Sequence, residues 1–125
     1  MSEKIIVSSL PKTWILDLDG TIVKHNGYKL DGHDTLLPGI DSFLNKIQPN
    51  DVVIFVTSRK EDVMEQTEEF LREAGIRYDH IIYNAPYGER ILVNDAKPSG
   101  LKTAIAINTS RNESCNVDFI TDESL

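Results

Sequence analysis

The sequence predicts an α/β fold: a single domain over residues 1–125, built on a doubly wound, Rossmann-like and mostly parallel sheet. A length of 125 residues with 40% hydrophobic side chains suits one domain with one core. Short apolar runs rich in β-favouring residues alternate with stretches of helical periodicity, which is the pattern of βαβ units. In such sheets the right-handed crossovers place ligands outside the carboxyl ends of the strands. Residues that follow the strands are therefore the candidates for function.

Two apolar runs are expected to form the central strands. Thr13–Leu18 (TWILDL) ends in acidic residues followed by a glycine, as a buried strand that leads into a loop would. Val52–Val56 (VVIFV) is apolar at consecutive positions, which suits a parallel strand covered on both faces. Shorter runs predict three further strands, at Ile81–Tyr83, Ile91–Val93 and Ala104–Ile107.

The clearest helix is predicted over residues 60–74. Its residues recur at helical spacing and form one buried stripe, made of Val63, Thr67, Phe70, Leu71 and Ala74. Ser58 and Glu61 have the S-x-x-E spacing of a capping box at the start of this helix. Gly75 falls where a helix commonly ends in a left-handed residue.

The remaining segments carry weaker signals. A shorter helix is expected to begin near Pro38 and to bury Ile40, Phe43, Leu44 and Ile47. The polar stretch between Gly20 and Leu37 has no sustained periodicity, so that residues 24–34 are expected to form a flap or hairpin beside the site. Residues 108–125 are polar and acidic apart from a short apolar patch, and we expect them to be frayed or to pack only at that patch.

Composition limits the expected partners and location. Thirteen basic and twenty acidic side chains give a formal charge of −7, which repels a polyanion, so nucleic acid is not an expected partner. The single cysteine, Cys115, cannot form an internal disulfide, which favours a reducing, cytoplasmic location. No stretch reaches the roughly 18 apolar residues of a membrane span, and residues 1–10 lack the apolar run of a signal peptide. A soluble protein without a membrane partner is therefore expected.

The most specific motif is Asp17-Leu18-Asp19-Gly20-Thr21, in which two carboxylates stand two residues apart at the end of an apolar strand. The glycine lets the chain turn. The structural alternative is an Asx turn, which aspartates commonly make where a strand ends.

This motif resembles the first motif of the haloacid dehalogenase (HAD) superfamily, an apolar strand followed by D-x-D-x-T or D-x-D-x-V. The resemblance implies a phosphatase in which Asp17 attacks phosphorus to give an aspartyl-phosphate and Asp19 serves as acid and then as base. Gly20 and Thr21 are then candidates for binding the phosphate. The resemblance also implies a Mg²⁺ ion held by Asp17, the backbone carbonyl of Asp19 and a later acidic residue. A hard cation is required because two carboxylates alone repel a phosphoryl group.

Thr57 closes the second central strand and resembles the family's second motif, a strand ending in a Ser or Thr whose hydroxyl binds the transferring phosphoryl group. A strand-terminal threonine before a helix is otherwise an ordinary cap or turn residue. Ser58 and Arg59 follow it, and with Lys60 they lie where the next helix begins, at an end that favours anions. We expect Ser58 and Arg59 to bind substrate phosphate, the alternative for Arg59 and Lys60 being exposure to solvent.

The run Ile91-Leu92-Val93-Asn94-Asp95 repeats the scheme of an apolar strand that ends in an acid. It resembles the family's last motif, which makes Asp95 the expected third Mg²⁺ ligand. Many members carry two acids at this point, whereas this chain has Asn94 before Asp95. Weaker metal affinity, or a water molecule in place of the second acid, is the expected consequence.

The lysine that bridges nucleophile and phosphate in this family usually lies before the last acidic motif. Between Thr57 and Asp95 this chain has only Lys60. Lys97, on a proline-containing loop two residues after Asp95, is therefore favoured for the role, with Arg90 as the second choice. A solvated loop lysine is the structural alternative for Lys97. A cation is needed in either case to neutralise charge in the transition state.

The spacing of the motifs leaves no room for a cap domain. Thirty-eight positions separate Asp19 from Thr57, and thirty-eight separate Thr57 from Asp95. The chain therefore resembles the capless HAD members, whose sites are open or are covered by a neighbouring subunit, so a homo-oligomer is one expected arrangement. Among these it resembles short proteins associated with polysaccharide biosynthesis, which implies a small phosphorylated metabolite, such as a sugar or polyol phosphate, as substrate.

Three other functions are left open. A phosphotransferase would pass the phosphoryl group from Asp17 to an alcohol instead of water. A non-catalytic module of the same fold would be expected to have degenerate catalytic aspartates, whereas Asp17, Asp19, Thr57 and Asp95 are all present here. A receiver-type phosphoacceptor would have no need of an acid at Asp19.

Overall fold

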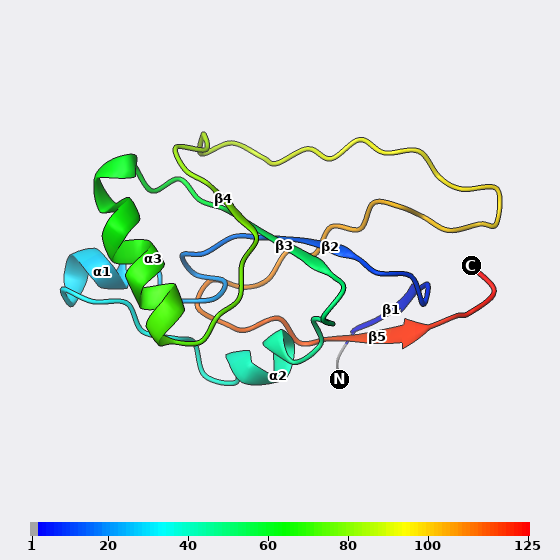
Figure 1. The fold of residues 1–125 in the computed structure, drawn as a ribbon, viewed down its shortest axis with the longest axis horizontal. Helices are drawn as coiled ribbons and strands as arrows, with labels where there is room; N and C mark the ends of the chain where they lie inside the picture. The colour runs from blue at the N-terminus through cyan, green and yellow to red at the C-terminus, as the bar shows by residue number, and fades with distance from the viewer. Residues whose placement is uncertain (1–2) are drawn as a thin grey trace.

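The computed structural model describes residues 3–125, so the first two residues of the expected 1–125 domain lie outside the described part. The elements follow one another along the chain as shown in Figure 1: β1 (Glu3–Val7), β2 (Thr13–Leu16), α1 (Gly27–Leu30), α2 (Ile40–Leu44), β3 (Val52–Val56), the 3₁₀ turn η1 (Glu61–Val63), α3 (Met64–Glu73), β4 (His80–Ile82) and β5 (Val117–Thr121). None of the helices in residues 3–125 is long and apolar enough to cross a membrane.

The strands form two small sheets in which every pair is parallel. The first sheet has the order β2-β3-β4, with Leu16 opposite Phe55 and Phe55 opposite Ile81. The second pairs β1 with β5, with Glu3 opposite Val117. The prediction of an α/β protein with parallel strands is confirmed, and the ranges expected for the central strands match β2 and β3 closely.

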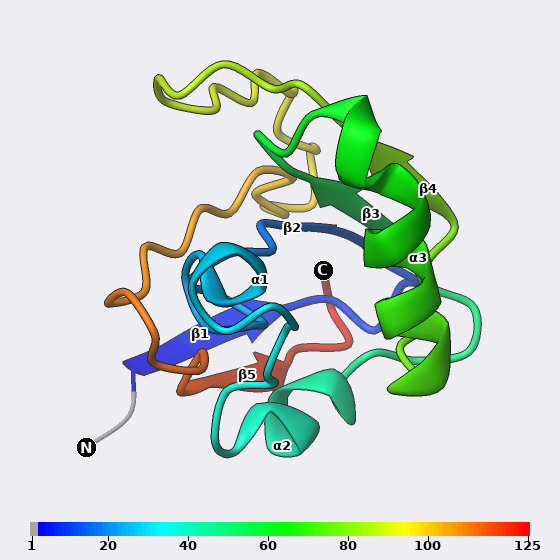
Figure 2. The same ribbon diagram turned by 90° about the vertical axis from the view of Figure 1, so that its left-hand side faces the viewer.

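The core lies between the first sheet and the helices. Leu18, Phe55 and Leu71 are almost completely buried. The helix α3 lies against the sheet (Figure 2), and its buried residues are Thr67 and Leu71. The ring of Trp14 meets Phe43 and Phe119 edge to face, with centroids 5.7 and 5.4 Å apart. Trp14 thereby joins β2 to α2 and to the second sheet.

The predicted helix over residues 60–74 is present in two parts, η1 followed by α3. Thr67 and Leu71 are buried while Phe70 and Ala74 are half-buried, which confirms the predicted stripe. Gly75 has φ of +71° and ends the helix as predicted. The capping box is wrong, because Lys60 is the N-cap and has no side-chain cap, and Glu61 instead accepts a hydrogen bond from Asn84 Nδ2 at 3.2 Å.

The shorter helix begins at Ile40, one residue after Gly39, whose φ of +77° places it in the left-handed region. The flap contains α1, and two isolated bridges lie beside it, Asp19 with Val23 and Val23 with Leu36. The C-terminal apolar patch at residues 117–120 falls within β5.

The strands expected at Ile91–Val93 and Ala104–Ile107 are wrong, because residues 86–110 contain no strand or helix. Figure 1 shows this segment leaving the end of β4 and running as an extended excursion beside the sheets. Ile91 and Val93 are 85% and 88% exposed, so the apolar run has neither a neighbouring strand nor a cover in this structure. A stable strand needs a neighbouring strand and a covering layer. The composition of residues 91–93 indicates only a high β-propensity.

Candidate functional site

The carboxyl ends of β2 and β3 bring two of the predicted site residues to one edge of the sheet. Leu16 lies opposite Phe55 in the parallel register, Asp17 directly follows Leu16, and Thr57 is two residues beyond Phe55. Asp19 is then linked across the same edge to Arg59, with Arg59 Nε 3.0 Å from Asp19 Oδ2. The first and second sequence motifs therefore meet at one place.

A tight loop over residues 18–23 holds the two aspartates. The amides of Ile22 and Val23 both donate to the carbonyl of Leu18, at 3.0 and 3.1 Å, and the amide of Gly20 donates to the carbonyl of Val23 at 2.7 Å. Gly20 has φ of +81°, which side chains rarely adopt, so that the loop needs glycine at this point. Asn112 closes the loop from outside, since its amide donates to the Gly20 carbonyl at 2.9 Å.

The Asp17 carboxylate is half-exposed and has a different partner on each oxygen. The hydroxyl of Thr21 lies 3.1 Å from Oδ2, and Nη1 of Arg90 lies 3.1 Å from Oδ1. Thr21, expected to bind phosphate, thus orients the Asp17 carboxylate. Arg90, the second choice for the bridging cation, is the one that the structure brings to Asp17.

Arg59 is buried at the centre of a network of carboxylates. Its Nε and Nη2 donate to the two oxygens of Asp19 at 3.0 and 2.9 Å. Nη1 and Nη2 donate to the two oxygens of Asp34 at 3.0 and 2.7 Å, and Nη1 also donates to Thr67 Oγ1 at 3.0 Å. A guanidinium has five N–H donors, and all five are accounted for by these bonds.

The surroundings of Arg59 keep it charged and fixed. Burial by itself lowers the pKa of the guanidinium, but the hydrogen bonds and negative charges of Asp19 and Asp34 outweigh it and raise the pKa above its ordinary value. The ring of Tyr28 covers the guanidinium with its centroid 4.0 Å from Cζ. The side chains of Arg59 and Asp34 are 1% and 2% exposed, while that of Asp19 is 18% exposed and so reaches the surface.

These contacts correct the expectation for Arg59. The sequence placed it against substrate phosphate or in solvent, and the structure places it in neither position, because its donors are used by Asp19, Asp34 and Thr67. Two of these partners were missed from the sequence. Asp34 lies in the flap, 25 positions before Arg59, and no motif or periodicity marks it.

Thr57 is buried and its Oγ1 accepts a hydrogen bond from the amide of Arg59 at 3.1 Å. Its own amide donates to the carbonyl of Ile82 at 2.9 Å, and its carbonyl accepts from Ala85, so the loops after β3 and β4 are tied together. The Thr57 hydroxyl therefore makes the contact of a turn residue, which was the alternative to a phosphate-binding role. Because the hydroxyl only accepts in this contact, it still has a proton to donate. Ser58 is half-buried beside it.

Asp95 and Lys97 lie outside this constellation. Both are exposed on the segment that carries no regular structure. The Asp95 carbonyl accepts a hydrogen bond from Thr103 Oγ1, and the Lys97 amide donates to the carbonyl of Leu101 at 3.0 Å, which folds the segment back on itself. The roles of Asp95 as a metal ligand and of Lys97 as the bridging cation stay predictions.

The arrangement of carboxylates does not fit a magnesium site as it stands. Oxygen donors are what Mg²⁺ prefers, and the expected ligands are the Asp17 carboxylate, the backbone carbonyl of Asp19 and Asp95. The two Asp17 oxygens accept hydrogen bonds from Thr21 and Arg90, and Asp95 is exposed on the segment that carries no regular structure. Within residues 3–125 no group of three or more His, Cys, Asp or Glu side chains is placed to hold a metal ion.

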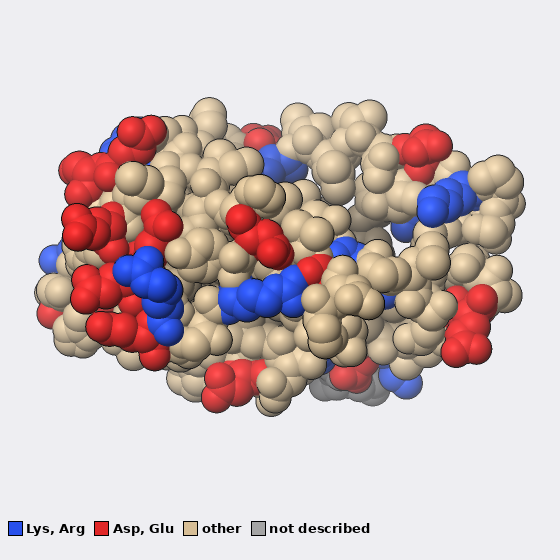
Figure 3. Space-filling view, viewed as in Figure 1, with Lys and Arg blue, Asp and Glu red and all other residues tan. Residues whose placement is uncertain are grey.

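Acidic side chains gather at the end of the molecule where α1 and α3 lie, as Figure 3 shows on one face. This is the end to which the carboxyl termini of β2 and β3 lead. α3 and η1 contribute Glu61, Asp62, Glu65, Glu69 and Glu73, all of them exposed. An anionic substrate approaching this end is repelled unless cations are present at the site.

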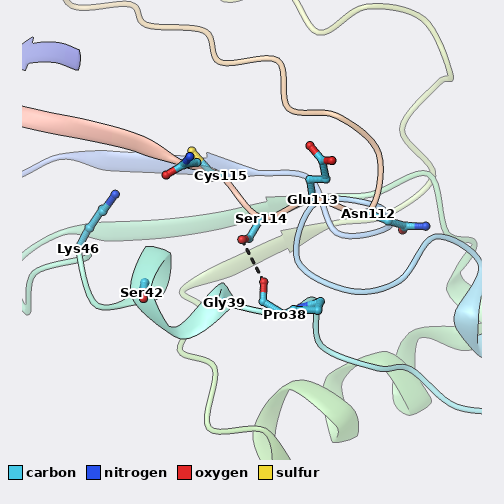
Figure 4. Close-up of a pocket in the computed structure, with 9 residues that line it drawn as sticks. Pro38, Gly39, Ser42, Lys46, Asn112, Glu113, Ser114 and Cys115 are labelled. Atoms are coloured by element: carbon cyan, nitrogen blue, oxygen red, sulfur yellow. Dashed lines mark hydrogen bonds between the residues drawn. The ribbon is translucent and has the colours of Figure 1, made fainter. Parts of the chain in front are cut away.

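A cavity of about 560 Å³ opens elsewhere, between residues 38–46 and residues 112–116 (Figure 4). Ser114 Oγ donates to the Pro38 carbonyl at 3.1 Å and closes one side of it. None of the predicted site residues lines this cavity. It is therefore separate from the Asp17 and Asp19 site.

No protein-family model matches the chain, and no curated protein matches it. Among solved structures, a chain of the Pnkp1/Rnl/Hen1 complex is similar, with 31% sequence identity, a TM-score of 0.51 and 66% of this chain covered. This chain spans 31% of the length of that one. The similarity supports the α/β fold with parallel strands.

Proposed function

We propose that the chain is a phosphomonoester hydrolase of the HAD superfamily, with a doubly wound fold and no cap domain, that works through an aspartyl-phosphate on Asp17. The observation that carries the proposal is the meeting of the Asp17 and Asp19 loop with Thr57 at the carboxyl ends of two adjacent parallel strands. Ligands of parallel α/β sheets bind at such an edge.

The geometry suggests a role for each residue in the first half of the reaction. An Asp17 oxygen attacks phosphorus in line, so that the new Asp17–phosphorus bond forms as the bond to the leaving oxygen breaks. Thr21 orients Asp17 through its 3.1 Å hydrogen bond. Asp19 donates a proton to the leaving oxygen, which departs as the alcohol. Thr57 is the candidate to donate its hydroxyl proton to a phosphoryl oxygen.

In the second half, Asp19 takes a proton from water, and the resulting hydroxide attacks the phosphorus of the aspartyl-phosphate. The Asp17–phosphorus bond breaks, inorganic phosphate leaves and the Asp17 carboxylate is restored. A cation must offset the charge of the phosphoryl group during both steps. Arg90 is supported for this by its contact with Asp17, and Lys97 stands as the sequence-based alternative.

Magnesium belongs to the proposal as the expected cofactor, with no step assigned to it, because Asp17, Asp19 and Asp95 do not form a metal site in this structure. The acidic character of this end of the molecule is what supports a need for a divalent cation. A small sugar or polyol phosphate remains the proposed substrate, and a cytoplasmic location and a homo-oligomer that covers the open site belong to the same proposal.

The absence of a cap is supported by what lies between the motifs. Residues 20–37 contain only α1 and two isolated bridges, and residues 58–79 contain only η1 and α3. A site without a cap is open, so substrate selection has to come from the loops or from a second subunit.

The test is release of inorganic phosphate from p-nitrophenyl phosphate and from a panel of sugar, polyol, amino-alcohol and nucleotide phosphates, with Mg²⁺ or with EDTA. Wild type is compared with Asp17→Asn and with Asp41→Asn, an exposed aspartate on α2. Turnover that needs Mg²⁺ and disappears only in Asp17→Asn is expected.

Other outcomes separate the alternatives. Transfer of phosphate to added alcohols in preference to water would indicate a phosphotransferase. Absence of turnover across the panel, with Mg²⁺ binding detected by calorimetry, would point to a non-catalytic module. Turnover that survives in Asp17→Asn would contradict the aspartyl-phosphate.

A further inference from the structure

We propose that Arg59 and Asp34 are positioning residues for Asp19, and that they fix the carboxylate that moves protons in the proposed reaction. This inference rests on the proposed function. Its physical basis is the network in which one buried guanidinium binds two carboxylates from different segments.

The contact between Arg59 and Asp19 restricts how the carboxylate can move. Nε and Nη2 bind the two oxygens at 3.0 and 2.9 Å, a two-point contact that fixes the plane of the carboxylate as well as its position. A single hydrogen bond would leave the group able to rotate. Each oxygen still has a second lone pair, and the 18% exposure of the Asp19 side chain leaves it open to a substrate.

Arg59 can serve as a fixed support because it is itself held on every side. Asp34 binds its far edge at 3.0 and 2.7 Å, Thr67 of α3 accepts a bond from Nη1, and Tyr28 covers its face. A lysine could supply the charge at this point but not the planar fork that joins two carboxylates. The role therefore belongs to the guanidinium.

Asp34 connects the flap to the site. It lies near the end of the segment between Gly20 and Leu37, while Tyr28 lies in α1 of the same segment, and both contact Arg59. The Asp34 side chain is 2% exposed, so a substrate that binds from solvent cannot contact it. Its position behind Arg59 lets the conformation of the flap determine where Asp19 stands.

The consequence depends on the leaving group. An alkoxide leaving group needs a proton from Asp19 as the bond to phosphorus breaks, whereas dinitrophenolate leaves without one. Misplacing Asp19 by a fraction of an ångström therefore slows alkyl phosphate hydrolysis and has little effect on 2,4-dinitrophenyl phosphate. A residue that only stabilises the fold would affect both substrates equally.

The test measures kcat and KM for β-glycerol phosphate and for 2,4-dinitrophenyl phosphate in Arg59→Lys and Asp34→Asn. We expect kcat for the alkyl phosphate to fall by about 100-fold in Arg59→Lys and by about 10-fold in Asp34→Asn, with KM little changed. For the dinitrophenyl ester the expected loss is within about 5-fold, because protonation by Asp19 is not required.

Matched controls come from the same chain. Arg72→Lys repeats the Arg to Lys change on an exposed position of α3, and Asp62→Asn repeats the Asp to Asn change on the exposed surface of η1. Both are expected to behave as wild type with both substrates. If Arg59→Lys does not fold, as judged by circular dichroism, Thr67→Val removes one partner of Arg59 while leaving its charges in place, and the same selective loss is expected on a smaller scale.

The outcomes separate this proposal from the proposed function. A wild type that turns over both substrates, combined with equal losses on both in the variants, overturns the positioning role and leaves the hydrolase intact. Wild type with no turnover of either substrate overturns the proposed function and this inference with it. Selective loss on the alkyl phosphate supports both.

Discussion

The indole Nε1 of Trp14 donates a hydrogen bond to Asp51 Oδ2 at 2.9 Å, which ties β2 to the turn before β3. Asp51 also accepts from the amide of Lys12 at 2.8 Å and from the amide of Gln48 at 2.9 Å, and the residue is buried. The carboxylate thus aligns the amino ends of two adjacent strands. Because their register is then set, it also aligns the carboxyl ends, where Asp17 and Thr57 lie.

Asp51→Ala is expected to lower the free energy of unfolding by about 2–4 kcal/mol, because three donors, two of them on half-buried residues, lose a buried acceptor. Urea denaturation followed by tryptophan fluorescence measures the change. Asp41→Ala, an exposed aspartate on α2, is the control and is expected to stay within about 0.5 kcal/mol of wild type. Equal effects of the two variants would contradict the role of Asp51.

The same carboxylate makes stability depend on pH. Burial alone raises the pKa of Asp51, but the hydrogen bonds from Gln48, Trp14 and Lys12 outweigh it and hold the pKa below its ordinary value of 3.8. The unfolded state therefore binds more protons, and this contribution is complete above pH 3.8 and is lost as the pH falls through the folded pKa. Unfolding midpoints measured between pH 7 and pH 2.5 are expected to fall less steeply for Asp51→Asn than for wild type.

Gly20→Ala is expected to reduce both stability and turnover. At φ of +81° a side chain is strained, and a Cβ would lie 3.3 Å from Arg111 Cγ, so the Arg111 side chain has to move by a few tenths of an ångström while the strain acts on the loop that carries Asp19. The expected loss of stability is about 1–2 kcal/mol, with kcat reduced about 10-fold or more.

Gly75→Ala is the control that separates the effect of backbone strain from the effect of a position in the candidate site. Gly75 has a similar φ of +71°, nothing lies within 4 Å of an added Cβ, and it ends α3 away from the loop of Asp17 and Asp19. Its alanine variant is expected to lose comparable stability at full kcat. A Gly20→Ala variant with unchanged kcat would show that the loop tolerates the strain.

The part of the fold that could be predicted from the sequence is the part encoded locally. Val52–Val56 is apolar throughout, and residues 60–74 have a helical stripe, so β3 and α3 were expected in place. The strand β1 was not expected, because Glu3–Val7 has only three apolar residues in sequence and its partner β5 lies more than a hundred residues away. Pairing of two weak, distant segments has no local signal.

The residues of the candidate site likewise fall into a part that the sequence predicts and a part that it does not. Asp17, Asp19 and Thr57 follow apolar strands, so the strands predicted where they would meet. Asp34 has no such marker, since its role arises from the packing of the flap against Arg59. Arg59, two residues after Thr57, is buried in the structure and must be paired because its charge is buried, but the sequence does not reveal that burial.

A double-mutant cycle is expected to show strong coupling between Arg59 and Asp34. Arg59→Met leaves the buried Asp34 carboxylate without its guanidinium and should cost about 3–5 kcal/mol. Replacing both, as Arg59→Met with Asp34→Leu, should recover a substantial part of that loss, because no unpaired charge then remains at Asp34. Urea denaturation of the four proteins measures the cycle, and additive losses would contradict a direct interaction.

Arg90 is expected to be the cation that serves Asp17 in the proposed reaction. Arg90 Nη1 lies 3.1 Å from Asp17 Oδ1 in the structure, whereas Lys97 lies in an exposed turn. Arg90→Gln is expected to lower kcat/KM for p-nitrophenyl phosphate by about 10–100-fold, because the phosphoryl charge loses a neutralising partner in the transition state. Lys97→Gln is expected to stay within about 3-fold of wild type. The reverse pattern, a large loss only in Lys97→Gln, would mean that residues 86–101 rearrange to bring Lys97 and Asp95 to Asp17 during turnover. In that case Mg²⁺ would protect the segment from proteolysis, and limited trypsin digestion with and without Mg²⁺ would detect it.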